Sequence, residues 1–464
     1  MDESMLTCLT SSATSPDQQA KALQYFEELK SSDLGWQMCV QAVTSRAYTD
    51  DHIQFFCLQV IEHFAKFRYS TSQPQEQQIL RDFLCQWTRF EADNNFHVPN
   101  LGSDSSFLKN KIAQVTALVF TQDYPTRWPN FFNDILFSCL QMGETAVDHY
   151  LRVLLAIDSE IGDKEINRTN MELQRNSIIK QAMRENVVNS LVDSWYTILT
   201  TYEKMNPVIV CRCLHVIGAY IHWIDINLVA NDRFVPLFVK ELSVLTLREA
   251  SAECIYGIIM KGMDPLAKTK LVESFNTVLT NVGAWEAVHT NLEEDGDPEY
   301  VSKLGKILNG MGTSLIENYH RISKSESKES ENSRAVIHAI ESKVNLALDF
   351  LGFPYDEVSS SVFDFIRDYL HLIKTKPMLN EHEKQHLVKT LQTVTKKMRV
   401  DDDYNFENEG EEEACFMEFR KQMKVLFDNV ALIDKSLVLE HVQGMVTNSL
   451  QNWKKLPFEV SSSC

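Results

Sequence analysis

Two histidines one helical turn apart are the residues of this chain best spaced for catalysis. His382 and His386 belong to the stretch HEKQH. This matches the H-E-x-x-H pattern, in which two imidazoles bind zinc and the glutamate acts as a general base. Glu407 or Glu409 offers a third ligand. The alternative is an ordinary helix start, because Asn380 is a suitable N-cap and no glycine or Met-turn signature follows. We favour the helix start, keep a zinc hydrolase as a distant alternative, and predict no catalytic residue, metal or cofactor.

A second pair, Cys211 and His215, also shares one helix face. A zinc site would need two more ligands, and none lies nearby in the sequence. The ten cysteines are far apart, and most lie in apolar helical runs such as FFCLQV around Cys57. We therefore predict reduced, buried thiols of a cytosolic or nuclear protein and no disulfide framework.

Charge narrows the class of partner. Lys and Arg number 45 against 64 Asp and Glu, a net charge of −19. This excludes a protein that coats nucleic acid with its whole surface and favours a partner with a basic face. RNA binding would require the basic residues to gather on one surface. The polar, acidic N-terminus is not a signal peptide, and the most apolar stretch, 213–230, contains two histidines and an aspartate, so we expect no membrane insertion.

Apolar residues recur at three- and four-residue spacing from Gln18 to Asn452, with almost no strand pattern. This periodicity predicts amphipathic helices throughout. The chain has only 15 Gly and 12 Pro, too few for an all-β fold. Helix pairs of unequal length with degenerate sequence are typical of HEAT repeats of about 40–47 residues. We predict an all-α, HEAT-repeat superhelical solenoid of antiparallel helix pairs with roughly ten repeats. Such a solenoid usually binds and does not catalyse.

Prolines, glycines and N-cap residues indicate where the expected helices begin and end. We place them at 17–29, 36–46, 53–67, 74–90, 109–120, 129–142, 145–161, 172–202, 206–223, 231–245, 247–261, 265–282 and 415–430. Two prolines within 124–132 predict a stiff elbow. The stretch Gly310-Met311-Gly312 lacks the third glycine of a dinucleotide site, and we expect it to break a helix.

Three segments depart from the helical pattern. Residues 323–334 are charged and of low complexity, which predicts a solvated loop. Residues 401–413 hold eight carboxylates and no basic residue, which indicates either a solvated loop or a docking segment for a basic partner. Residues 453–464 form a divergent tail. The expected division is 1–142, 143–322, 323–334, 335–452 and 453–464.

Several stretches resemble a known family. YTDDHIQFFCLQVIEH, NKIAQVTALVF and YPTRWPNFF, within 48–132, resemble the N-terminal repeats of karyopherin-β (importin-β family) nuclear transport receptors. YLRVLLAIDSEI, GAYIHWIDINLVANDRF, KGMDP and YNFENEGEEEACFMEFRKQ, within 150–422, are similar to the tRNA export branch, exportin-T. The resemblance runs to about Trp453. Members of that branch are about twice as long, so we expect a truncated product or an alternative isoform that comprises the N-terminal half.

The resemblance implies a nuclear export receptor that is not an enzyme. Such a receptor binds tRNA cooperatively with Ran in its GTP form, passes the nuclear pore by contacting pore proteins, and shuttles between nucleus and cytoplasm as a monomer. The alternative within binding proteins is a HEAT scaffold or an importin for protein cargo. Five aromatic residues, Tyr124, Trp128, Trp195, Trp223 and Phe234, are expected to pack in the core.

Binding candidates follow from polar positions. Ran would meet the second helices of the early repeats, which gives Gln37, Gln41, Gln78, Asp82, Asn133 and Asp134. The acidic run adds Glu407, Glu409, Glu411, Glu412 and Glu413, because Ran presents a basic surface. Candidates for tRNA are the basic residues on both sides of that run, Lys396, Lys397, Arg399, Arg420, Lys421 and Lys424.

Overall fold

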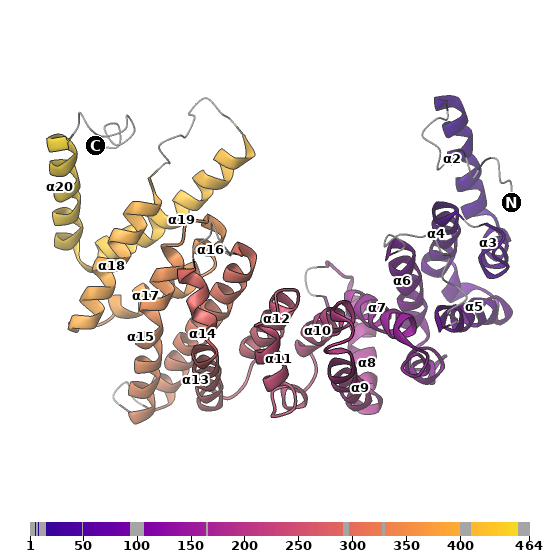
Figure 1. Ribbon diagram of the computed structural model, residues 1–464, viewed down its shortest axis with the longest axis horizontal. Helices are drawn as coiled ribbons and strands as arrows, with labels where there is room; N and C mark the ends of the chain where they lie inside the picture. The colour runs from indigo at the N-terminus through magenta and orange to yellow at the C-terminus, as the bar shows by residue number, and fades with distance from the viewer. Residues whose placement is uncertain are drawn as a thin grey trace. The chain divides into compact units, whose positions relative to one another are not determined.

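The computed structural model describes residues 15–48, 50–92, 106–163, 166–290, 297–326, 330–399 and 410–452, together with Met5 and Cys8. Over these residues the chain is helical and contains no strand. It divides into two compact units, Met1–Phe234 and Val235–Cys464. Each unit is a series of helices that follow one another in space as they do in sequence (Figure 1). The all-α prediction is confirmed, and the finer division into five segments stays a prediction.

The helices of the two units have the following bounds. The first unit holds α2 (Pro16–Ser31), α3 (Gly35–Thr44), α4 (Asp51–Phe67), η1 (Tyr69–Thr71), α5 (Pro74–Ala92), α6 (Ser106–Asp123), η3 (Phe132–Phe137), α7 (Glu144–Ile161), α8 (Asn170–Asn186), α9 (Val188–Tyr202), α10 (Pro207–Ile221) and η4 (Ile226–Leu228). The second holds α11 (Val235–Glu241), α12 (Arg248–Met260), α13 (Pro265–Asn281), η5 (Ala284–His289), α14 (Pro298–Ser325), α15 (Glu331–Leu351), α16 (Asp356–Ser360), α17 (Phe363–Lys374), α18 (Glu381–Lys397), α19 (Glu411–Ile433) and α20 (Lys435–Asn452).

Within each unit, helices pack on their neighbours as in a helical repeat protein. In the first unit α3 packs on α4, while α4 also packs on α6 and α3 on α5. In the second unit α14 contacts α12, α13, α15 and α17. Each helix therefore meets its partner and its counterpart in the next pair, as HEAT repeats require. Large side chains fill the space between the helices. The rings of Trp36 and Phe64, for example, stack with centroids 3.9 Å apart.

Side-chain caps explain where several helices begin. Ser15, Thr169 and Asn380 each form a capping box, in which the cap side chain accepts from the N3 amide and the N3 side chain accepts from the cap amide. Asp50 and Asp264 accept from two backbone amides at the starts of α4 and α13. These contacts satisfy amides that have no partner within the helix. The predicted helix starts at these caps are confirmed to within a few residues.

Three predicted helices differ from the structure. The helix expected at 172–202 is two helices, because the backbone leaves the helical region at Val187, with φ −135°. The apolar period crosses this break, since Met183 and Val188 are both buried, so the pattern alone does not record the turn. The helix expected at 129–142 is centred on the six-residue π-helix η3. The one expected at 231–245 is the short α11.

The break predicted at 310–312 is wrong, because α14 runs unbroken through it. Both glycines serve close packing. A Cβ on Gly312 would lie 2.1 Å from the ring of Phe365 on α17, and one on Gly310 would lie 2.8 Å from the Met260 sulfur on α12. The glycines therefore let neighbouring helices approach α14 closely, which outweighs their low helix propensity.

Two further segments are more helical than expected. The loop predicted at 323–334 is shorter, because α14 extends to Ser325 and α15 begins at Glu331. Helix α19 begins at Glu411, four residues before the predicted start. Residues 401–409 of the acidic run and the tail 453–464 lie outside the described residues. No described helix is both long and apolar enough to cross a membrane.

The glycine at position 312 provides a test of this packing. Gly312→Ala should lower the free energy of unfolding by about 1–3 kcal/mol, because the new methyl group must displace Phe365. Gly444→Ala is the matched control, since a Cβ there meets nothing within 4 Å inside α20, and it should be neutral or stabilising by up to about 1 kcal/mol. Urea unfolding followed by circular dichroism measures both. Equal effects at the two positions would contradict the close approach.

Candidate partner-binding surfaces

The six polar residues predicted on the early second helices lie on neighbouring elements. Helix α3 packs on α5, and α5 packs on η3. Gln78 and Asp82 are exposed one turn apart on α5, and the Gln78 amide donates to the Asp82 carboxylate at 2.8 Å. Asp134, exposed on η3, accepts from the Trp128 indole N–H at 2.8 Å. The other three complete the set: Gln37 is half-buried and Gln41 exposed on α3, and Asn133 is exposed on η3.

Behind this surface lies a buried ion network centred on Asp123, at the end of α6. The Asp123 carboxylate has no solvent exposure. It accepts from the Tyr69 hydroxyl at 2.6 Å and from the Arg81 Nε at 2.8 Å, and its second oxygen pairs with the Arg127 Nε at 3.0 Å. Burial beside this carboxylate raises the pKa of Tyr69, so the phenol remains a donor. The network ties η1, α5, α6 and the elbow together.

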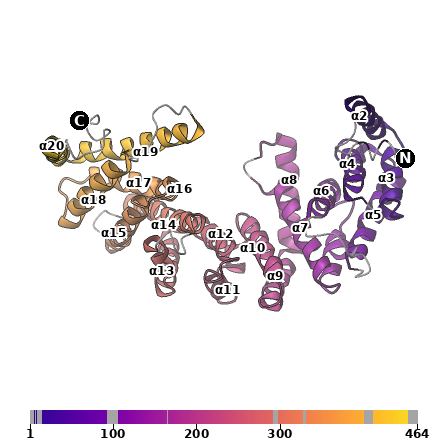
Figure 2. The ribbon, with the colours of Figure 1, turned by 45° about the horizontal axis from the view of Figure 1, so that its top comes forward.

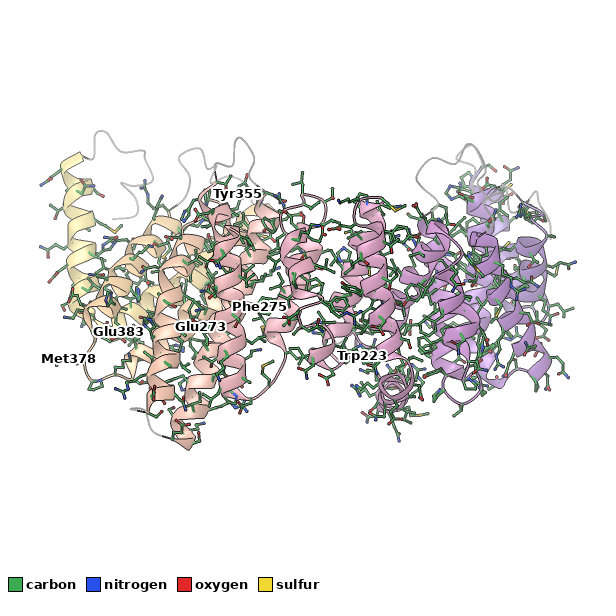
Figure 3. All side chains as sticks on the ribbon, turned by 60° about the horizontal axis from the view of Figure 1, so that its bottom comes forward. Trp223, Glu273, Phe275, Tyr355, Met378 and Glu383 are labelled. Carbon is green, nitrogen blue, oxygen red and sulfur yellow. The ribbon has the colours of Figure 1, made fainter. Side chains whose placement is uncertain are left out.

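A second buried contact joins α7 to the segment after α10. The Trp223 indole N–H donates to the Asp158 carboxylate at 2.9 Å, and the Trp223 carbonyl accepts from the Arg184 Nε at 3.0 Å. Figure 3 labels Trp223. Burial raises the pKa of Asp158 to about 6. The Tyr220 hydroxyl donates to the Leu154 carbonyl at 3.0 Å. These residues come from two of the family-like stretches, and both stretches act here as joints between helices.

The stretch KGMDP is also a joint, between α12 and α13. The ammonium of Lys268 is buried and donates to the Lys261 carbonyl at 2.7 Å and to the Ile259 carbonyl. It thereby caps the end of α12. Burial lowers the pKa of Lys268 to about 8. None of Asp123, Asp158 and Lys268 is among the residues predicted from the sequence. The sequence does offer one indication of such residues, which is a single charged residue at a position where the helical period predicts an apolar one.

The five aromatic residues expected in the core pack as predicted, with one exception. Tyr124, Trp128, Trp195 and Phe234 are buried. Trp223 is half-buried, because its edge serves the bond to Asp158. The elbow is therefore an aromatic cluster, in which the Tyr124 ring stacks on Phe120 with centroids 5.0 Å apart.

The basic candidates lie on two adjacent helices, α18 and α19, or just past the end of α18, but one of them is held inside. Lys397 is 10% exposed in its side chain, pairs with Asp356 at 2.7 Å, and donates to the Phe353 and Pro354 carbonyls. It therefore holds α18 to the turn before α16 and is not a free cation. Lys396 and Arg399 are exposed, and Arg420 is half-buried.

Two lysines on α19 are exposed in surface ion pairs. Lys421 pairs with Glu418 at 2.9 Å and Lys424 with Asp428 at 2.6 Å. Exposed pairs of this kind contribute about 0–1 kcal/mol, so a phosphate can displace the carboxylate. Of the acidic candidates, Glu407 and Glu409 lie outside the described residues. Glu411, Glu412 and Glu413 form the first turn of α19.

The H-E-x-x-H stretch is a helix start. Glu383 is 1% exposed, closes the capping box with Asn380, and pairs with Lys376 (Figure 3). His386 is buried with its Nδ1 2.8 Å from the Tyr369 hydroxyl, and burial lowers its pKa. His382 is exposed. The glutamate and one imidazole are thus engaged in packing, and the described residues contain no group of three metal-ligand side chains.

The Cys211 and His215 pair also has a structural explanation. The Cys211 sulfur lies 3.5 Å from the His215 Nε2, as their spacing predicts. Cys211 is half-buried, and so are Cys8 and Cys85, while Cys415 is exposed. The prediction of buried thiols is confirmed for five others, Cys39, Cys57, Cys139, Cys213 and Cys254.

Comparison with known proteins shows which families this chain resembles. A family model described as "Exportin 1-like protein" matches residues 105–255, and one described as "Exportin-T" matches residues 330–461. Exportin-T of Danio rerio is 41% identical over 458 residues, which cover 99% of this chain and 46% of that protein. Exportin-T of Homo sapiens has the same identity and coverage. The chain spans about half the length of the curated relatives it matches.

A solved structure shows the same fold. Yeast importin-beta (Kap95p) aligns with a TM-score of 0.52 over 98% of this chain and 55% of that one, at 12% sequence identity. The helix pairs and this alignment define a HEAT-repeat solenoid with the importin-beta fold. Within that fold, the chain is similar to exportin-T, both in overall sequence and in the match of residues 330–461.

The Asp123 network gives a first stability prediction. Asp123→Asn keeps the shape of the side chain but removes the buried charge that half-buried Arg81 and the more exposed Arg127 both meet. It should lower the free energy of unfolding by about 3–5 kcal/mol. Asp33→Asn is the matched control, because Asp33 is 92% exposed in its pair with Arg68, and it should cost less than about 1 kcal/mol. Urea unfolding of both variants decides. Similar small losses would mean that the network does not join the repeats.

The raised pKa of Asp158 gives a pH-dependent prediction. A carboxyl whose folded pKa lies above its unfolded value of 3.8 stabilises the fold at low pH, and this contribution is lost as pH rises to about 6. At pH 7.5 the ionised form therefore carries a cost of about 2–3 kcal/mol. Asp158→Asn retains an acceptor for Trp223 without the charge. Its unfolding free energy should exceed that of the wild type at about pH 7.5 and match it near pH 4. A variant less stable at both pH values would contradict the buried charge penalty.

Proposed function

We propose that this chain is a nuclear export receptor that binds tRNA cooperatively with Ran in its GTP form and carries it through the nuclear pore. The observation that supports this most directly is the 41% identity to exportin-T over 99% of the chain. The receptor moves between nucleus and cytoplasm, acts as a monomer, and contacts pore proteins through its outer surface. It is not an enzyme, because its work is to bind and release.

The Ran surface is proposed within residues 1–142. The amides and carboxylates on α3, α5 and η3 are exposed or half-buried, and they lie on elements that pack in succession. Polar side chains of this kind suit a partner with a basic face, because charge complementarity sets orientation and association rate. Of these elements, α5 is also held by the buried Asp123 network, through Arg81. The acidic side chains from Glu407 to Glu413 are the second proposed contact.

The proposed tRNA contacts are five of the six basic candidates on α18, α19 and their junction, with Lys397 left out. They are Lys396, Arg399, Arg420, Lys421 and Lys424. Structured RNA is recognised through its shape and phosphates, which lysine and arginine can meet without reading bases. Since the chain as a whole is acidic, only such a local group can attract a polyanion. Lys397 is proposed to support this surface from within.

Cooperativity follows if Ran and tRNA favour the same arrangement of the repeats. A solenoid changes shape by small rotations at many joints. A ligand that selects one arrangement then lowers the cost of binding the other, and the effect is reciprocal. The alternatives remain a HEAT scaffold or an importin for protein cargo. Exportins load cargo with Ran-GTP and importins release it, so the sign of the Ran effect separates the two.

The test is tRNA binding to the purified chain, with and without Ran locked in its GTP form, over a range of salt concentrations. We expect tight tRNA binding only when Ran-GTP is present, with affinity falling steeply as salt rises because phosphate contacts release counterions. Fluorescence anisotropy of labelled tRNA measures both. Binding of Ran without tRNA would show that a chain of this length lacks the export switch, and binding of neither would favour the scaffold.

Charge reversal separates the two proposed surfaces in the same assay. Replacing Glu411, Glu412 and Glu413 by lysine should weaken Ran-GTP binding and flatten its salt dependence. Replacing Lys421 and Lys424 by glutamate should weaken tRNA binding and leave binary Ran-GTP binding unchanged. Unchanged Ran affinity and salt slope in the first variant would reject the acidic contact.

A further inference from the structure

Helix α8 has two side-chain stripes, and only one of them is packed. Its buried residues are Asn176, Ile179 and Met183, which contact neighbouring helices of the first unit. A second stripe, Met171, Gln174, Arg175 and Ile178, has the i, i+3, i+4, i+7 spacing of a single helix face. Met171 is 82% and Ile178 is 55% exposed. A helix with apolar side chains at such positions is prepared to bury them against something else.

This second stripe forms one wall of a groove. The groove has a volume of about 440 Å³, within the range of ligand-binding sites. The elbow forms the opposite wall, with Tyr124, Pro125 and Arg127 among its lining residues. Figure 2 shows α8 next to α6, the helix that leads into the elbow. The elbow is braced by the Asp123 network, so this wall is rigid and the site is largely preformed.

The charge of the groove is opposite to that of the chain. Its lining includes Arg127 and Arg175 and no carboxylate, whereas the chain carries a net charge of −19. Arg127 is held by Asp123 and by the Gln122 carbonyl, and the Arg175 Nε donates to the Asn176 side chain at 3.2 Å. A guanidinium has five N–H donors, so these bonds orient both groups while others can meet a ligand.

The carboxylate of α8 nearest to the groove, that of Glu172, is engaged in capping the helix. The Glu172 side chain accepts from the Thr169 amide and hydroxyl, each at 2.8 Å, as part of the capping box. Glu160, which lies near Arg175, is held at the end of α7 and does not line this groove. The groove thus combines apolar side chains of α8 with the oriented guanidinium groups of Arg127 and Arg175.

We propose that the groove between α8 and the elbow binds a short acidic, amphipathic segment of a partner protein. Apolar side chains of that segment would cover Met171 and Ile178, and its carboxylates would pair with Arg175 and Arg127, since arginine matches carboxylates in a bidentate manner. The groove is built from α8 and the elbow, whereas the proposed Ran contacts lie on α3, α5 and η3 and the proposed tRNA contacts on α18, α19 and their junction. None of those contacts is part of the groove.

The probe is a short fluorescein-labelled amphipathic peptide with leucines on one face and glutamates on the other. We expect saturable binding to the full chain by fluorescence polarisation, and at least tenfold weaker binding of the same peptide with lysines in place of the glutamates. Ile178→Gln and Arg175→Glu should each weaken binding of the glutamate peptide about tenfold. Leu173→Gln is the matched control, because Leu173 is 54% exposed on the same helix but does not line the groove.

Circular dichroism and thermal unfolding of each variant show that a loss of binding is not a loss of fold. Equal binding of the lysine peptide would overturn the charge argument. Equal losses in Ile178→Gln and Leu173→Gln would place the peptide outside the groove, and an absence of saturable binding would reject the site. Sedimentation of the chain over a range of concentrations adds a further arm, because self-association abolished by Ile178→Gln would replace the peptide with a second copy.

Discussion

The structure depends on one constraint: each helix pair must be fixed on the next. The buried carboxylate of Asp123 is an example. A repeat protein has no single core, so its order comes from the interfaces between neighbours. Apolar packing supplies most of the stability there but tolerates sliding and rotation. A buried ion pair does not, because a charge that loses its partner inside the protein is costly. Asp123, bound by Tyr69, Arg81 and Arg127, joins η1, α5, α6 and the elbow in this way.

The same principle recurs along the chain with other chemistry. Asp158 accepts from Trp223, Lys268 caps the end of α12, and Lys343, which is 1% exposed, pairs with Glu273 across α13 and α15. Asp158 and Trp223 belong to stretches that resemble the family, and Lys268 donates to the Lys261 carbonyl at the start of a third. Family likeness in these stretches therefore reports how repeats are joined and does not itself locate a binding surface. Function must be sought on polar positions between the joints, which the joints hold in register.

A chemical motif has meaning only in its surroundings. The H-E-x-x-H stretch satisfies the spacing of a zinc site, yet its glutamate serves as a helix cap and one of its histidines packs against Tyr369. Lys397, one of several basic residues close together in the sequence, likewise donates to backbone carbonyls of a turn in its own unit. Conversely, α8 resembles the other amphipathic helices in sequence but leaves a second face open to a groove with two arginines.

The sequence by itself determined the helices, their caps and the repeat class, because helical periodicity and capping are local and recur within a few residues. It also contained the stretches that mark the family. Only the tertiary structure decided how each polar residue is used. The glycines at 310 and 312 signalled a break, but they permit close contact with Met260 and Phe365 instead. Burial, ion pairing and close approach depend on residues distant in the chain. A local sequence pattern does not indicate which of those residues will be in contact.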